Sequence, residues 1–173
     1  MGNYTSGSEA TLPADTTDLT DHTYDATDLT AVESNDNSSY VGQAAAGEYA
    51  IHMFKDAVTG ISVDLTWSGK TDLAPSTSPV QLQVYKVAAT AGWVNAPGAG
   101  ASDSTTAADT DFDLTSTLST TTTPTLADCL DGGVLTCRVY QNYQGVPDTV
   151  WVSSVGGDTW VSSTGGDYWV STT

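Results

Sequence analysis

Two segments of the chain alternate between apolar and polar side chains. Residues 61–67 place an apolar side chain at every second position, and residues 80–85 do the same with valine and leucine. A period of two sends alternate side chains to opposite faces of a β-strand, so each segment predicts a strand with one buried face. Further strands are expected at 48–54, 87–94, 112–118 and 135–140. Short strands separated by turn-rich stretches predict an all-β chain that folds as a β-sandwich or jelly roll.

The charge balance excludes whole classes of partner. The chain carries 21 acidic residues against 4 Lys and Arg, a formal net charge of −17, and no Lys or Arg precedes Lys55. Such a chain repels polyanions, which argues against nucleic acid and against anionic membrane surfaces as partners. No apolar run is long enough to span a bilayer or to form the core of a signal peptide, so we expect no membrane insertion.

Composition divides the chain into three segments. Residues 1–47 are polar and acidic, residues 48–143 hold the expected strands, and residues 144–173 hold a repeat. We therefore predict an acidic N-terminal arm, a β-sandwich body and a C-terminal repeat segment. The arm has two interpretations: it is disordered, or it is extended and adds one or two strands to a neighbouring surface. The body is expected to fold without the repeat segment, in a chain that ends at Gln144.

The repeat segment spaces Trp151, Trp160 and Trp169 by nine residues, with Gly-Gly-Asp between them. If the segment forms a three-stranded meander with four-residue loops, the odd period places all three tryptophans on one face, together with Ser153 and Ser162. The valines that follow each tryptophan then face the body. A row of tryptophans is either an assembly surface for a neighbouring subunit or a platform on which sugar rings stack, and both interpretations stay open.

Two cysteines flank a short glycine turn. A three-residue loop from Gly132 to Val134 would place Cys129 and Cys137 directly opposite each other across a hairpin, which predicts a disulfide. In the chain-entropy description, closing so short a loop stabilises the fold by roughly 2–3 kcal/mol, and it implies an oxidising compartment. The alternative is a pair of small buried thiols.

Three aspartates at alternate positions form a second candidate site: Asp109, Asp111 and Asp113. Alternate residues of a strand lie on one side, and several carboxylates with loop carbonyls can enclose a structural calcium ion. Leu114 occupies the position at which a helix-loop-helix calcium loop needs glycine, so that specific motif is absent. The alternative is that the aspartates face water while their apolar neighbours face the core. No other cofactor is expected.

The sequence lacks the motifs of common enzyme classes. It contains no Gly-x-Ser-x-Gly, no His-Glu-x-x-His, no phosphate-binding glycine loop and no dinucleotide fingerprint. His52 lies in an expected strand without a nucleophile nearby in the sequence. We therefore expect a protein that is not an enzyme.

Three stretches of the body resemble an uncharacterised β-rich module of phage-like structural proteins and cell-surface proteins. They are Asp72–Tyr85 (DLAPSTSPVQLQVY), Ser104–Phe112 (STTAADTDF) and Cys137–Gln141 (CRVYQ), and the resemblance covers about residues 48–141. It implies a β-rich fold and an extracellular or virion setting, and it carries no catalytic or binding residue over to this chain. The tryptophan repeats fall outside the resemblance.

These observations lead to two functional hypotheses. The first is a non-enzymatic structural subunit of an extracellular or virion surface assembly, a filament or appendage, in which strand exchange and aromatic contacts join the subunits into a homo-oligomer. The alternative is a glycan-binding or adhesion module that uses the tryptophan row. Both hypotheses place the protein outside the cell, at a cell surface or on a virion.

Overall fold

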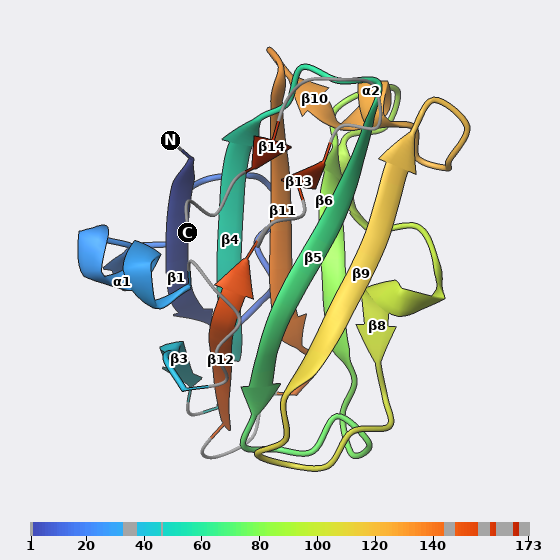
Figure 1. Ribbon diagram of the computed structural model, residues 1–173. Coiled ribbons are helices and arrows are strands. Elements are labelled where there is room, and N and C mark those ends of the chain that lie inside the picture. The colour runs from blue at the N-terminus through green and yellow to red at the C-terminus, as the bar shows by residue number, and fades with distance from the viewer. Residues whose placement is uncertain are drawn as a thin grey trace.

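The chain folds into two antiparallel sheets that pack face to face as a β-sandwich (Figure 1). The structure, a computed structural model, describes residues 2–32, 38–45, 47–143, 148–155, 160–161 and 168–169. Beyond residue 143 it describes the backbone of these strands and the side chain of Val152. The prediction of an all-β sandwich is confirmed.

The larger sheet, called sheet A, has eight strands and the main order β2-β1-β4-β11-β6-β7, with β10 paired to β11 and β8 paired to β6. Its neighbouring strands are antiparallel, so the sheet is built from hairpins and longer connections that cross the sandwich. The strands of sheet A are β1 (Asn3–Glu9), β2 (His22–Thr23), β4 (Tyr49–Ala57), β6 (Val80–Lys86), β7 (Gly92–Asn95), β8 (Ser102–Asp103), β10 (Leu130–Asp131) and β11 (Val134–Gln141).

The smaller sheet, called sheet B, has four strands in the order β3-β12-β5-β9, and a separate two-stranded ribbon pairs β13 with β14. In Figure 1, β12, β5 and β9 lie in front of β4, β11 and β6. The strands of sheet B and of the ribbon are β3 (Val41–Ala45), β5 (Ser62–Thr71), β9 (Phe112–Ser119), β12 (Asp148–Val155), β13 (Trp160–Val161) and β14 (Tyr168–Trp169).

The helices are short: α1 (Ala26–Ala31), η1 (Ala99–Ala101) and α2 (Leu126–Cys129). Within the described ranges, no helix has the length and apolar character that crossing a bilayer requires. A capping box starts α1, because the Asp25 side chain accepts from the backbone N–H of Asp28 and the Asp28 side chain accepts from the backbone N–H of Asp25.

The core lies between the sheets and follows the alternation seen in the sequence. Val63, Leu65 and Trp67 of β5 are buried, and Leu114 of the neighbouring β9 is buried beside them. The polar residues between these positions lie on the outer face of sheet B. Ile61 is an exception to the expected pattern, because it precedes β5 and is 57% exposed.

Strands from all three predicted segments take part in the two sheets. β1 and β3 come from residues 1–47, and β12 comes from residues 144–173. β12 lies between β3 and β5, and its residue Val152 is fully buried. The expected three-stranded meander is therefore wrong at its first strand, because both edges of β12 are already paired. The expectation that the body folds in a chain that ends at Gln144 loses its basis for the same reason.

Candidate functional site

The outer face of sheet A carries polar and aromatic side chains over β6, β7 and β11. In β6, Val80, Leu82 and Val84 are buried in the core, so Gln83 and Tyr85 lie on the opposite, outer face of the sheet. The same alternation in β11 and β7 places further side chains on this outer face. They are Arg138, Tyr140, Trp93 and Asn95.

A row of hydrogen bonds crosses three strands of this face. Arg138 and Gln83 are register partners, and the Nε and Nη2 atoms of Arg138 donate to Oε1 of Gln83 at 2.9 and 2.7 Å. Gln83 and Asn95 are register partners on the other side, and Nε2 of Gln83 donates to Oδ1 of Asn95 at 3.0 Å. Asn95 is exposed. The row therefore ends in an amide that reaches solvent and that can both donate and accept hydrogen bonds.

An aromatic pair lies beside this polar row. Tyr85 and Trp93 are register partners, and their rings meet edge to face with centroids 5.3 Å apart and planes at 75°. Both side chains are partly exposed. Edge-to-face packing fixes the orientation of both rings. The pair thus offers a rigid apolar surface next to the Gln83 and Asn95 amides.

The loop of residues 10–21, between β1 and β2, covers the other half of the outer face. Pro13 and Asp15 contribute backbone oxygens, which accept from Nη1 of Arg138 at 2.8 Å and from Nε1 of Trp93 at 3.0 Å. Leu19 packs in a cluster with side chains of β4 and β11. The β4 side of the face is therefore filled by the chain itself, whereas Tyr85 and Trp93 on the β6–β7 side stay partly exposed.

Among the described residues, Arg138 is the one charged group of this face that is buried, with 3% of its surface exposed. Burial lowers the pKa of its guanidinium to about 10, so the group stays protonated at neutral pH. In the described part of the chain no carboxylate forms an ion pair with it. The guanidinium instead lies 4.2 Å from the centroid of the Trp93 ring and 5.4 Å from that of Tyr140. Aromatic faces and neutral oxygens stabilise this charge.

The predicted tryptophan row divides between two parts of the structure. Trp151 lies in β12, where it pairs with Gly42 of β3 and Lys70 of β5, whereas Trp160 and Trp169 are register partners in the β13–β14 ribbon. The side chains of these three tryptophans lie outside the described part of the structure. The same holds for the side chain of Ser153 and for the whole of Ser162. The row of tryptophans on one face stays a prediction.

In this structure Cys129 and Cys137 are buried free thiols, and the predicted disulfide stays a prediction. The turn before β11 holds two residues, Gly132 and Gly133, both with positive φ, and it pairs Leu130 with Leu135. The expected loop of three residues would have paired Cys129 with Cys137. Shortening the turn by one residue shifts the register by one and removes that pairing.

Two of the three aspartates proposed for calcium have side-chain partners of their own. Asp111 accepts a hydrogen bond from the hydroxyl of Tyr40, and Asp113 accepts one from Ser68. Asp109 lies in a turn with φ of 55°. No group of three potential metal ligands gathers in the ranges that the structure describes, so the calcium site stays a prediction.

No sequence motif pointed to Tyr85, Trp93, Gln83, Asn95 or Arg138 as site residues. A signal for two of them was present, because the alternation over residues 80–85 sends Gln83 and Tyr85 to the face opposite the core. The other three belong to β7 and β11, whose pairing with β6 joins distant parts of the chain.

The chain matches no protein-family model and no curated protein sequence. Among solved structures, it is similar to a family 16 carbohydrate-binding module at 14% identity and a TM-score of 0.38, over 66% of this chain and 73% of that one. A family 61 module in complex with β-1,4-galactotriose aligns at 8% identity and a TM-score of 0.37, over 66% of each chain. A family 4 carbohydrate-binding module aligns at 11% identity and a TM-score of 0.35, over 66% of this chain and 91% of that one. Similarities this low assign neither a function nor a site to this chain.

Proposed function

We propose that this protein is a non-catalytic module that binds a neutral glycan on the outer face of sheet A. The observation that carries the proposal is the partly exposed Tyr85–Trp93 pair beside the hydrogen-bonded amides of Gln83 and Asn95. The proposed site therefore contains Trp93 and not the tryptophans of the repeat segment, to which the sequence had assigned glycan binding.

The chemistry of the face matches a sugar ring. A pyranose has an apolar face of C–H groups, which packs on an aromatic ring, and a rim of hydroxyls, which need both donors and acceptors. Tyr85 and Trp93 supply the aromatic surface, and the Asn95 amide supplies both kinds of hydrogen-bonding group at the exposed end of the row. The rings are already held in place by Arg138 and by each other, so binding does not have to order them.

The charge of the protein favours an uncharged ligand. The net charge of −17 repels polyanionic glycans at long range. The single arginine on this face is buried and already bonded to neutral oxygens. We therefore expect glycans without carboxylate or sulfate groups to bind more tightly than acidic ones.

The composition of the face supports binding without catalysis. Its aromatic pair and polar row contain no carboxylate and no histidine, the usual general acids and bases. His52, which lies in β4, is fully buried and has its Nδ1 2.7 Å from the hydroxyl of Tyr24. It is therefore not placed to act on a ligand held by Tyr85 and Trp93.

Calorimetric titration with four neutral tetrasaccharides, of β-linked glucose, xylose, mannose and galactose, tests the proposal. At least one is expected to bind, and Trp93→Ala and Asn95→Ala are each expected to weaken it by about tenfold or more. Asn95 is exposed, so its variant separates a binding defect from a folding defect. Trp160→Ala tests the alternative site in the tryptophan repeats, because Trp160 lies in the separate ribbon.

Two results would contradict this assignment. If none of the four sugars binds, the glycan-binding function is wrong for these classes. If Trp160→Ala abolishes binding while Trp93→Ala and Asn95→Ala leave it intact, the site lies in the tryptophan repeats instead.

The structural-subunit hypothesis, with strand exchange between neighbours, remains a separate prediction. Light scattering of the full chain at increasing concentration tests it. A monomer at all concentrations contradicts it and leaves the glycan-binding proposal untouched.

A further inference from the structure

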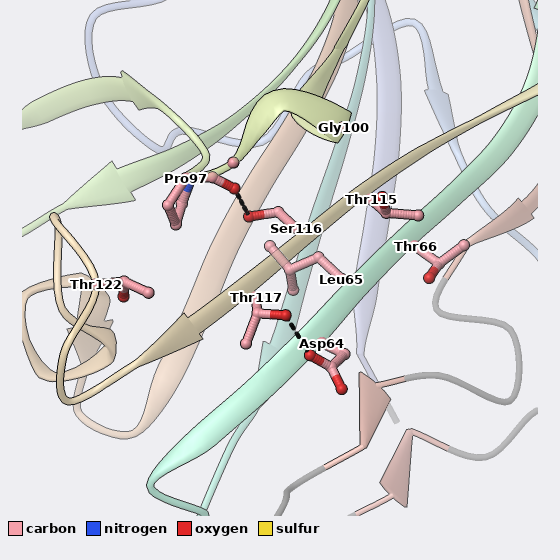
Figure 2. A pocket seen from close by; sticks show the side chains of 10 residues that line it. Asp64, Leu65, Thr66, Pro97, Gly100, Thr115, Ser116, Thr117 and Thr122 are labelled. Atoms are coloured by element: carbon pink, nitrogen blue, oxygen red, sulfur yellow. Dashed lines mark hydrogen bonds between the residues drawn. The ribbon is translucent and has the colours of Figure 1, made fainter.

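A groove of about 510 Å³ lies on the outer face of sheet B, over the β5–β9 pair (Figure 2). Asp64 and Thr66 of β5 and Thr115 and Thr117 of β9 line its floor. These side chains alternate with the buried residues of the same strands, which is why they face outward. The groove is thus on the opposite side of the sandwich from Tyr85 and Trp93.

The floor of the groove is an ordered set of polar pairs. Asp64 is the register partner of Thr117, and Thr66 is the register partner of Thr115. The Thr117 hydroxyl donates to Oδ1 of Asp64 at 2.5 Å. Asp64 keeps a second carboxylate oxygen as an acceptor, and the threonine hydroxyls can donate or accept. Thr115 and Thr117 are exposed, so a ligand can reach them.

The segment of residues 97–100 forms one wall of the groove and is fixed against β9. The Ser116 hydroxyl donates to the backbone oxygen of Pro97 at 2.6 Å. A Cβ atom on Gly100 would lie 2.4 Å from Oγ1 of Thr115 and 2.9 Å from its backbone oxygen, so this close approach requires glycine. The wall is therefore held against β9 by this hydrogen bond and by the close approach at Gly100.

The lining selects a ligand class. The residues of the groove include hydroxyls, backbone groups and one carboxylate, and they include no cation and no aromatic ring. A single carboxylate is a poor cation site, and a groove without cations does not attract anions. Hydroxyl-rich neutral molecules match these donors and acceptors, and a volume of about 510 Å³ falls within the range of small-molecule sites.

We propose that the β5–β9 groove is a second binding site, which takes a neutral saccharide and holds it by hydrogen bonds. Two sites on opposite faces of one molecule can link two glycan chains, and this bridging rests on the function proposed for sheet A. The proposal of a binding site in the groove depends only on the residues that line the groove.

The tryptophan ribbon lies close to this second site. β13 contacts β5, the strand that supplies Asp64 and Thr66. In Figure 1 the β13 and β14 arrows lie beside the upper half of β5. The backbone position of Trp160 is therefore next to the strand that forms the groove, which gives the repeat segment a place beside a ligand.

The test uses the full chain with the sheet A site weakened. In the Asn95→Ala and Trp93→Ala backgrounds, we expect residual binding of at least one of the four neutral tetrasaccharides. Adding Thr117→Val, which removes the hydroxyl and keeps the shape, is expected to weaken that binding by about tenfold. Asp113→Asn is the matched control: Asp113 accepts a 2.5 Å hydrogen bond from Ser68 across the same two strands, outside the groove.

The outcomes separate the two sites. No residual binding in either background, or residual binding that Thr117→Val leaves unchanged, overturns the groove proposal and leaves the sheet A site standing. Binding to the wild-type chain that Thr117→Val abolishes and Trp93→Ala does not affect supports the groove and contradicts the sheet A site. Equal losses from Thr117→Val and Asp113→Asn would mark a general electrostatic or folding effect and overturn the groove proposal.

A second readout tests the bridging. Turbidity of a soluble neutral polysaccharide is expected to rise on addition of the wild-type chain, and to stay low with either Asn95→Ala or Thr117→Val alone. Turbidity that persists in both single variants contradicts bridging through these two sites.

Discussion

The guanidinium carbon of Arg138 lies 4.2 Å from the centroid of the Trp93 ring on the outer face of sheet A. Arg138 also donates to neutral oxygens of Gln83 and Pro13. One arginine therefore joins the aromatic pair, the polar row and the 10–21 loop. A cation held over an indole ring away from water stabilises the folded state by about 2 kcal/mol. This contact therefore holds the Trp93 ring in the orientation that we propose for ligand binding.

Replacing Arg138 with lysine is expected to destabilise the fold. Lysine keeps the charge but cannot reproduce the forked donors that reach Gln83 and Pro13 together. We expect Arg138→Lys to lower the free energy of unfolding by about 1–3 kcal/mol, measured by urea denaturation at pH 7. Lys70→Gln is the control, because Lys70 lies 4.4 Å from the Tyr40 ring in a partly exposed position. A larger effect of the Lys70 variant would contradict our interpretation of Arg138.

The two cysteines are expected to react as protected thiols. Both are buried, and burial raises the pKa of Cys129 to about 11 and that of Cys137 well above its usual value. Because the thiolate is the reactive form, alkylation of the folded protein at pH 8 is expected to be slow. Two thiols per chain are expected after denaturation without reductant, in a colorimetric thiol assay. Fewer than two would restore the disulfide that the sequence alone predicts.

Alkaline pH is expected to destabilise the protein. Burial raises the pKa values of the Tyr4 and Tyr24 hydroxyls and of the Cys137 thiol above those of the unfolded chain. These groups keep their protons in the folded state and lose them in the unfolded state, so their contribution is complete at neutral pH and declines as the pH rises from about 9. The Cys137 thiol contributes to this decline from about pH 9 and the two tyrosines from about pH 10, and each group lowers the free energy of unfolding by at most about 1.4 kcal/mol per pH unit above its unfolded-state pKa.

Urea denaturation between pH 7 and 11 measures this decline. For Tyr4 and Tyr24, the phenolate absorbance is expected to rise together with unfolding and not before it. Tyr24→Phe is expected to reduce the slope above pH 10, because one titrating group is removed. Constant stability up to pH 11 would contradict the burial of these groups.

The alternation predicted the core strands well, and its failures have a physical cause. β5 and β6 each carry three apolar residues at every second position, which predicts their buried face, and β9 follows the same pattern except at Ser116. β1 does not, because its buried residues include Thr5 and Ser6. Ser6 donates to Oε1 of Gln43 at 2.8 Å, so a hydrogen bond rather than an apolar side chain satisfies this position. A polar strand of this kind looks like a linker in the sequence.

The candidate site was harder to predict than the fold. Gln83 and Tyr85 were visible as outward-facing residues, but their partners come from β7 and β11. Arg138 lies 55 positions from Gln83 in the chain. Sequence periodicity reports the faces of single strands and contains no information on which strands become neighbours. The cysteine register shows the same limit, since one residue in the Gly132–Gly133 turn decides the pairing.

Strand β12 is expected to be required for the cooperative fold. A chain that ends at Gln144 lacks β12, so β3 and β5 lose a common neighbour and the fully buried Val152 leaves the core. We expect this chain to lose cooperative unfolding, measured by circular dichroism during urea denaturation. A chain that ends at Val155 keeps β12 and is expected to unfold cooperatively, and Val152→Ala in the full chain is expected to lower the free energy of unfolding by about 1–3 kcal/mol. Wild-type stability of the chain that ends at Gln144 would contradict the interior position of β12. If the chain that ends at Val155 is also unstable, the tryptophan ribbon and not β12 alone stabilises the fold.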